Sequence, residues 1–202
     1  MRAFSPTENG WLVADPNAAT LAKAQERYTS RQHHARGLGV RSNFESDLQW
    51  VGDLGEIGFD RWLHDESVTH DWNGGVDRLP DFSVLGNAVG LKTRYSKVAT
   101  RADFYAVVPA QHLDRQQETE WFFANYEVGS NRLVLLGGVS AERFREAARF
   151  VDTGEPIGPT TKARNPVWQF DVSLLDAPDR WLCSLSAHLL AGTSCRCGAF
   201  LL

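Results

Sequence analysis

The chain has 202 residues, a formal net charge of −4 and no global excess of basic residues, so any phosphate-binding surface must be local. Hydrophobic residues make up 43% and charged residues 23%, a balance typical of a folded globular protein that excludes a disordered one. No apolar run reaches the roughly 20 residues needed to cross a bilayer, and the polar N-terminus is unlike a signal peptide. We therefore expect a cytoplasmic protein with no membrane partner.

Lysine is scarce beside arginine, with only four lysines in the chain. This bias is typical of a GC-rich genome, and we expect a bacterial or phage-encoded protein. The length favours one domain with a substantial core over the whole of 1–202.

Helix signals stand at the start of the chain. The pair Asp15-Pro16 combines an N-cap with proline at the first helical position, which predicts a helix to about Arg36. Apolar residues then recur at helical spacing, which predicts a second helix from Ser46 to about Leu63.

Strand signals follow, and the turn dipeptide Gly86-Asn87 joins the first two as a hairpin. A further helix is expected at 141–150, capped by Ser140. The fold class is therefore α/β with a central mixed β-sheet flanked by helices, its core at 46–150 and a C-terminal extension at 151–202. The expected strands are 82–85, 88–91, 103–108, 120–128, 132–136, 168–172 and 181–185.

Glu56 is the unusual residue of the second helix. It shares a helix face with Gly52, Phe59 and Leu63, which lie three or four residues from one another. Burying a carboxylate is costly unless another group pairs with it, so Glu56 on this face indicates a functional site. A partly exposed glutamate on a mixed face remains the alternative.

Two further motifs follow Glu56 along the chain. Leu79-Pro-Asp-Phe82 opens the first expected strand, and Leu91-Lys-Thr-Arg94 lies on the second. Glu56 on a helix, Asp81 on a strand and Lys92 on the next strand, in this order, resemble the PD-(D/E)XK nuclease superfamily. The resemblance covers 52 to about 136 and implies a restriction-endonuclease-like core.

The resemblance also implies a metal-dependent nuclease that hydrolyses phosphodiester bonds of DNA. Its cofactor would be Mg²⁺ or Mn²⁺, hard cations that prefer oxygen ligands. Asp81 would be the central ligand, with Glu56 and the backbone carbonyl of Leu91 as further ligands. Lys92 would orient the attacking water and stabilise negative charge on the phosphate.

The next two residues, Thr93 and Arg94, are candidates for contacts with the DNA phosphates, since arginine can bind a phosphate through two parallel hydrogen bonds. Whether the protein acts as a homodimer stays open.

Gly90 departs from the pattern, since the superfamily usually has an acidic residue two positions before the lysine. Three explanations stay open: the acid has moved elsewhere, with Asp77 as one candidate; the site uses fewer protein ligands and more water; or catalysis has been lost. In the last case the chain would be a catalytically impaired nucleic-acid-binding module, or an interaction protein.

The C-terminal extension contains ligand types for zinc, namely Cys183, His188, Cys195 and Cys197. One residue separates the last two cysteines, which is closer than zinc knuckles normally place them. Small buried thiols and a surface histidine are therefore the favoured interpretation. Three cysteines in a cytoplasmic chain also argue against a disulfide framework.

Overall fold

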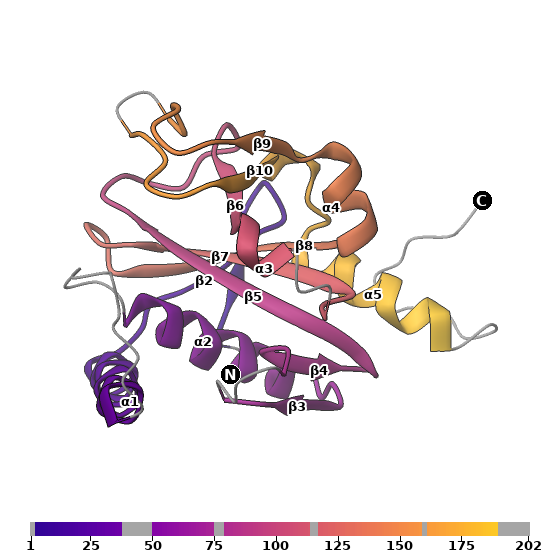
Figure 1. The fold of residues 1–202 in the computed structure, drawn as a ribbon. Coiled ribbons are helices and arrows are strands. Elements are labelled where there is room, and N and C mark those ends of the chain that lie inside the picture. The colour runs from indigo at the N-terminus through magenta and orange to yellow at the C-terminus, as the bar shows by residue number, and fades with distance from the viewer. Residues whose placement is uncertain (1–2, 38–49, 75–78, 114–116, 159–160, 190–202) are drawn as a thin grey trace.

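The computed structural model describes residues 3–37, 50–74, 79–113, 117–158 and 161–189. Within these residues a seven-stranded mixed sheet lies at the centre of the molecule (Figure 1). Its strands are β1 (Ser5–Pro6), β2 (Leu12–Ala14), β3 (His70–Trp72), β4 (Phe82–Val84), β5 (Asn87–Ser96), β7 (Glu120–Glu127) and β8 (Arg132–Ser140). They are ordered β1-β2-β8-β7-β5-β4-β3, and β5 and β7 are parallel. The expected α/β class with a central mixed sheet flanked by helices is confirmed.

A second, three-stranded sheet covers part of one face of the large sheet. It has the order β6-β10-β9, with β6 at Tyr105–Pro109, β9 at Arg149–Val151 and β10 at Val167–Asp171. The helices of the described residues are α1 (Ala18–Gly37), α2 (Val51–Asp65), α3 (Ala110–Leu113), α4 (Ala141–Ala147) and α5 (Pro178–Leu189), and a 3₁₀ turn spans Val172–Leu174.

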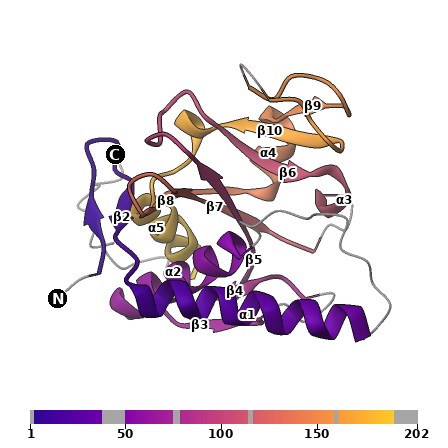
Figure 2. The ribbon, with the colours of Figure 1, turned by 90° about the vertical axis from the view of Figure 1, so that its left-hand side faces the viewer.

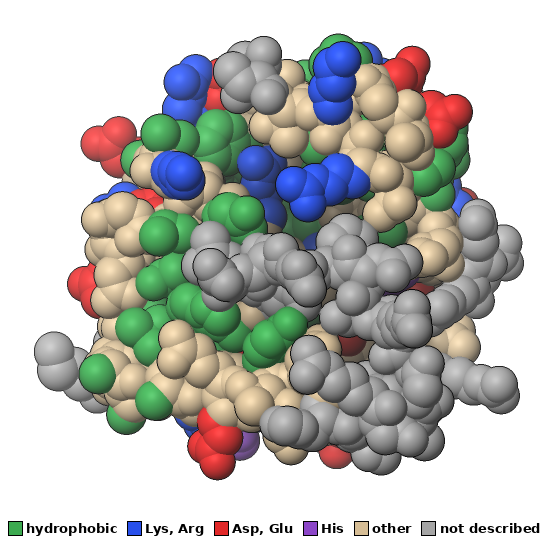
Figure 3. Space-filling view, turned by 60° about the vertical axis from the view of Figure 1, so that its left-hand side comes forward, with side chains coloured by type: hydrophobic (Ala, Val, Ile, Leu, Met, Phe, Trp, Pro, Cys, Tyr) green, Lys and Arg blue, Asp and Glu red, His purple; other side chains and the backbone are tan. Residues whose placement is uncertain are grey.

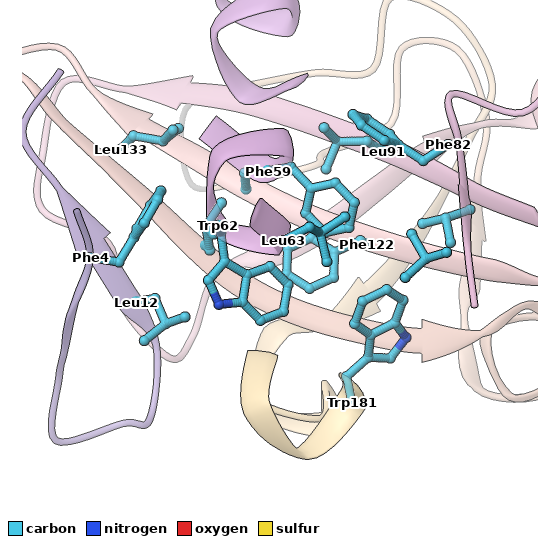
Figure 4. Packing of buried hydrophobic residues seen from close by; sticks show 14 of the residues in the cluster. Phe4, Leu12, Phe59, Trp62, Leu63, Phe82, Leu91, Phe122, Leu133 and Trp181 are labelled. Carbon is cyan, nitrogen blue, oxygen red and sulfur yellow. The ribbon is translucent and has the colours of Figure 1, made fainter. Parts of the chain in front are cut away.

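The core has a layer on each face of the large sheet. On one face α2 and α5 pack on the strands, and Phe59 of α2 lies 4.6 Å from Phe122 and 4.9 Å from Phe82 between ring centroids (Figure 4). On the other face Phe144 of α4 stacks on Phe170 of β10 at 5.4 Å. Large buried aromatic groups on both faces hold the sheet in place.

Helix α1 packs against α2 at the edge of the molecule and crosses it steeply (Figures 1 and 2). It has 20 residues and is mostly polar. None of the helices in the described residues is long and apolar enough to cross a membrane.

The β4–β5 hairpin is the local structure that positions the candidate site. Its two-residue turn is formed by Leu85 and Gly86, both with positive φ (49° and 78°), one residue earlier than the sequence indicated. β4 is short, and its pairing with β5 reaches only from Asn87 to Val89. The remainder of β5 therefore extends past the start of β4, where Asp81 lies.

The sequence prediction was wrong near the C-terminus. The expected strand at 181–185 is part of helix α5, which begins at Pro178 as proline favours. Trp181 and Leu185 are four residues apart and both buried, which is the helical period rather than the strand period. The expected helix at 141–150 ends at Ala147, and residues 149–151 form β9 instead.

Candidate metal and phosphate site

Asp81 and Lys92 meet beside the backbone of Leu91, where β5 runs past β4. The Lys92 Nζ atom lies 3.6 Å from Asp81 Oδ2 and donates a hydrogen bond to the Leu91 carbonyl at 3.2 Å. The Leu91 N–H donates to the same Asp81 oxygen at 2.7 Å. Both charged side chains remain accessible to solvent, at 28% for Asp81 and 21% for Lys92. A carboxylate, a carbonyl and an ammonium thus face one another at an open edge of the fold.

Glu56 lies in a more enclosed position on α2, 8% exposed. Trp72 of β3 donates its Nε1–H to Glu56 Oε2 at 3.1 Å. Two arginines of α1 reach the same carboxylate: Arg27 at 3.3 Å from Oε2, and Arg31 at 3.5 Å from Oε1. The sequence indicated that a buried Glu56 needs a partner, but it did not reveal that α1 supplies arginines.

A second buried carboxylate, Asp53, completes this ionic network. Its side chain is fully buried and pairs with Arg31 and with Arg27. The Arg27 guanidinium also stacks over the Trp72 ring at 4.1 Å. The network joins α1, α2 and β3 at one place.

Glu56 and Asp81 are near enough to repel each other electrostatically. Burial raises the pKa of Glu56 above its ordinary value of 4.5, the Arg31 guanidinium lowers it, and the Asp81 and Asp53 carboxylates raise it further. A divalent cation between Glu56 and Asp81 would relieve this repulsion. The donors present, two carboxylates and the Leu91 carbonyl, are the oxygen ligands that Mg²⁺ and Mn²⁺ prefer, so the residues fit such an ion.

The two candidate phosphate contacts lie on opposite faces of β5. Side chains alternate along a strand, so Thr93 faces α2 while Arg94 shares the face of Lys92. A Cβ atom on Gly55 of α2 would lie 1.8 Å from Thr93 Oγ1, which shows how closely the helix approaches. The Thr93 hydroxyl is buried without a hydrogen-bond partner among the described residues, so it is not presented to a ligand on the Lys92 face.

Arg94 is exposed, and its Nη1 donates to the Tyr105 carbonyl at 3.1 Å while its guanidinium lies over the Phe104 ring. Lys and Arg side chains gather in the upper half of the face shown in Figure 3. This grouping gives a locally positive surface on a chain whose net charge is −4.

The space around Gly90 is already occupied. A Cβ atom at this position would lie 2.4 Å from the Trp121 ring and 2.9 Å from Glu118 Cγ. The Lys92 ammonium lies over the same Trp121 ring, 5.1 Å from its centroid. Gly90 therefore allows the indole and the Glu118 side chain to pack against β5 next to Lys92.

Glu118 is the acidic residue that sequence reasoning missed. It precedes β7, which pairs in parallel with β5, and it is half-buried. The register of a parallel pair whose partners are 31 positions apart cannot be read from local patterns, so no sequence signal pointed to Glu118. Asp77, the substitute considered from the sequence, lies outside the described residues.

The predicted C-terminal zinc ligands are described only in part. Cys183 on α5 is disulfide-bonded, although the sequence argued against a disulfide framework. A disulfide sulfur is not the thiolate that zinc binds, and the sequence did not indicate this bond. Cys195 and Cys197 lie outside the described residues, as does the side chain of His188.

A surface hollow of about 260 Å³ lies elsewhere, between the β1–β2 turn and strands β7 and β8. Of its two acidic residues, Glu8 and Glu127, the second is paired with Arg132 at 2.9 Å and accepts hydrogen bonds from the Thr100 N–H and the Ser130 hydroxyl. Since these partners hold both carboxylate oxygens, Glu127 offers less free bonding capacity than Asp81.

Comparisons of the chain with protein-family models, with curated proteins and with solved structures return no match. Function must therefore be inferred from the residues of the site.

Proposed function

We propose that the protein is a metal-dependent nuclease that hydrolyses phosphodiester bonds of DNA on a restriction-endonuclease-like core. The observation that carries the proposal is the meeting of the Asp81 carboxylate, the Leu91 carbonyl and the Lys92 ammonium at the open edge of β5. Glu56 lies on the preceding helix. Burial raises its pKa, and the Asp81 carboxylate is near enough to raise it further. The order helix, strand, strand and the three side chains agree with the PD-(D/E)XK nuclease superfamily that the sequence resembles.

Mg²⁺ or Mn²⁺ would be held by Asp81, the Leu91 carbonyl and Glu56, directly or through water. Such an ion, when bound, supplies a water of lowered pKa and positive charge opposite the phosphate oxygens. Among the described residues, the Leu91 N–H and the Lys92 ammonium both contact the Asp81 carboxylate at its Oδ2 atom. Those contacts restrict the orientation of the side chain, and Oδ1 is the oxygen that would bind the ion.

Lys92 supplies a fixed positive charge next to the attacked phosphate. Its ammonium is held by Asp81, by the Leu91 carbonyl and by the face of the Trp121 ring, three contacts that limit its motion. Positive charge that is oriented before the reaction stabilises developing negative charge without reorganisation. Arg94, two residues further on the same face, is placed to bind a neighbouring phosphate.

Glu118 is the proposed replacement for the acid that Gly90 lacks. Its Cγ atom occupies the space that a side chain at position 90 would enter, on the Lys92 face of β5. A carboxylate placed beside Gly90 from the segment just before β7 could bind the ion or its water shell, as an acid on β5 would. Of the three explanations for Gly90, this one is favoured by an observed side chain.

The second candidate function is binding of nucleic acid without cleavage. It is favoured by the contacts of Glu56, because both of its carboxylate oxygens already have arginine partners. In that case Glu56 and Asp53 would serve to attach α1, and the Lys and Arg side chains of Figure 3 would bind phosphates.

Nicking of supercoiled plasmid in the presence of Mg²⁺ or Mn²⁺ tests the proposal, with linear single- and double-stranded DNA and RNA as further substrates. We expect cleavage of DNA that EDTA abolishes and that Asp81→Asn removes, because the amide lacks the negative charge of the central ligand. Glu118→Gln should reduce cleavage by about tenfold or more, the scale of a partner that supports a metal site. Salt-dependent binding without cleavage by the wild type would instead establish the binding module.

A further inference from the structure

A second group of metal-ligand side chains lies on the C-terminal half of α2, beginning one helical turn beyond Glu56. Asp60 and His64, four residues apart on α2, meet His70 at the start of β3. One ligand atom from each of the three lies within 4.8 Å of the others, and no other set of three His, Cys, Asp or Glu residues in the described ranges meets this condition. The sequence analysis did not single out any of these residues.

Both ring nitrogens of His70 face hydrogen-bond acceptors. Its Nδ1 atom lies 2.9 Å from the Val68 carbonyl, and its Nε2 atom lies 3.0 Å from Asp60 Oδ1. Both neighbours are acceptors, but a neutral imidazole has a single N–H. When the single N–H is on Nδ1 and donates to the Val68 carbonyl, Nε2 and the Asp60 carboxylate both present lone pairs to each other. Their contact is then favourable only with a second proton on the ring or a metal ion bound by both groups.

The spacing of the ligand atoms matches a metal ion. His70 Nε2 and His64 Nε2 lie 3.0 Å and 3.7 Å from Asp60 Oδ1. Two ligands that each lie about 2.0–2.1 Å from a tetrahedral ion are roughly 3.3 Å apart, and the two observed distances bracket this value. The Val68 carbonyl holds the far side of the His70 ring, as outer partners of metal-bound histidines typically do.

We propose that Asp60, His64 and His70 form a binding site for a zinc-class divalent ion. Two imidazole nitrogens and one carboxylate favour Zn²⁺, Co²⁺ or Ni²⁺ over Mg²⁺, because imidazole suits the transition metals. His70 is 4% exposed and fixed by packing, whereas His64 is 72% exposed and can close onto an ion from solvent. The exposed side leaves room for a water molecule as the remaining ligand.

The ion would connect α2 to β3, the two elements whose contact also positions Glu56. Trp72 lies two residues after His70 on β3 and donates to Glu56 on α2. A metal bond between the same elements should therefore stabilise the fold around Glu56. The site does not depend on the proposed nuclease activity, since none of its ligands belongs to the Asp81 edge.

Titration of EDTA-treated protein with Zn²⁺ by calorimetry, and with Co²⁺ by visible absorption, tests the proposal. The Asp81→Asn variant is used as the parent, so that ions at the Asp81 edge do not contribute. We expect one ion per chain, cobalt bands typical of nitrogen and oxygen ligands, and a higher midpoint of thermal unfolding with Zn²⁺. Adding His64→Ala, an exposed change that should leave the fold intact, should weaken binding by at least about tenfold.

Asp60→Asn should weaken binding in the same way while keeping the shape of the side chain. His112→Ala is the matched control, because it removes an imidazole from α3, outside the cluster, and should leave the affinity unchanged. Equal affinity of the parent and the His64→Ala and Asp60→Asn variants would overturn the proposal. Absence of saturable binding to the parent would do the same, and the three side chains would then form a hydrogen-bond network only.

Discussion

The carboxylates of Asp53 and Glu56 differ from that of Asp81 in what their surroundings leave free. Asp53 and Glu56 are buried on α2, and Arg27 and Arg31 of α1 neutralise them. Asp81 is partly open to solvent, and its contacts with the described residues Leu91 and Lys92 fall on one oxygen. Asp53 and Glu56 therefore attach α1 to the fold, whereas Asp81 keeps the capacity to bind a ligand.

This difference separates stability from activity within one small region. Removing one of the two buried carboxylates takes a counterion from both arginines, so it should destabilise the protein. Removing a half-exposed carboxylate costs little stability, because water can solvate the group that remains. Glu56 bears on both stability and the proposed activity, since it belongs to the arginine network and also interacts electrostatically with Asp81.

The largest stability change is expected for Asp53→Ala. It leaves Glu56 as the carboxylate partner of both arginines, Arg27 and Arg31. We expect a loss of roughly 3 kcal/mol in the free energy of unfolding, at the lower end for a buried pair because both arginines reach solvent. Urea denaturation measures the loss. Asp103→Ala is the control, because Asp103 forms an exposed ion pair with Arg101, and it should cost less than about 1 kcal/mol. A smaller effect for Asp53→Ala than for its control would remove the distinction between the two regions.

Lys92→Ala should change the rate of DNA cleavage rather than the stability of the fold. Loss of one preorganised positive charge should slow DNA cleavage by about a hundredfold or more. Lys92→Arg should restore only part of the rate, because a planar guanidinium does not fit where a compact ammonium contacts Asp81 and the Trp121 ring. The measurement is single-turnover cleavage at saturating metal. Lys97→Ala, at an exposed lysine just after β5, should cleave as the wild type does; equal losses for both variants would indicate a general charge effect.

Gly90→Ala sharpens the interpretation of the missing acid. The new methyl group would lie 2.4 Å from the buried Trp121 ring, and overpacking of this kind typically costs about 1–3 kcal/mol. Gly52→Ala on α2 is the control, because a Cβ there has no neighbour within 4 Å, and it should stabilise the protein by up to about 1 kcal/mol. Thermal unfolding of both variants gives the comparison. Unchanged stability of Gly90→Ala would mean that Trp121 and Glu118 do not fill that space.

The smallest expected effect is the pH dependence that Glu56 introduces. Burial raises the pKa of Glu56 in the folded protein above 4.5; the Arg31 guanidinium opposes this rise, and the Asp81 and Asp53 carboxylates add to it. The folded state then holds the proton more tightly than the unfolded state, so the stability contributed by this group falls as pH rises from 4.5 through the raised pKa. Urea unfolding of the wild type and of Glu56→Gln between about pH 4 and 8 should show the wild type losing stability relative to the variant as pH rises. A relative gain instead would mean that the arginines outweigh burial.

The sequence was most informative where structure is local. Asp81 and Lys92 lie on one hairpin, and its two-residue turn brings them within 3.6 Å of each other. Contacts between distant segments could not be read in the same way. The approach of Arg27 and Arg31 to Glu56 depends on how α1 packs on α2, and the position of Glu118 depends on the parallel register of β5 and β7.

The same limit explains the error at α5. Trp181 and Leu185 form an apolar pattern short enough to suit either a strand or a helix. The choice is made by the tertiary structure, in which Trp181 packs 4.8 Å from Phe122 and donates its Nε1–H to Glu120. His64 and His70 were likewise missed, because their meeting depends on how β3 returns along α2.

Calorimetric titration with Mn²⁺ tests most directly whether Asp81 is a metal ligand. The His64→Ala variant serves as the parent, so that the cluster on the other half of α2 does not contribute. We expect one Mn²⁺ per chain in this parent, loss of that binding in Asp81→Asn, and nearly unchanged binding in Lys92→Ala, because the lysine acts on the phosphate and not on the ion. Mn²⁺ binding in Asp81→Asn as tight as in the parent would contradict a metal site at Asp81.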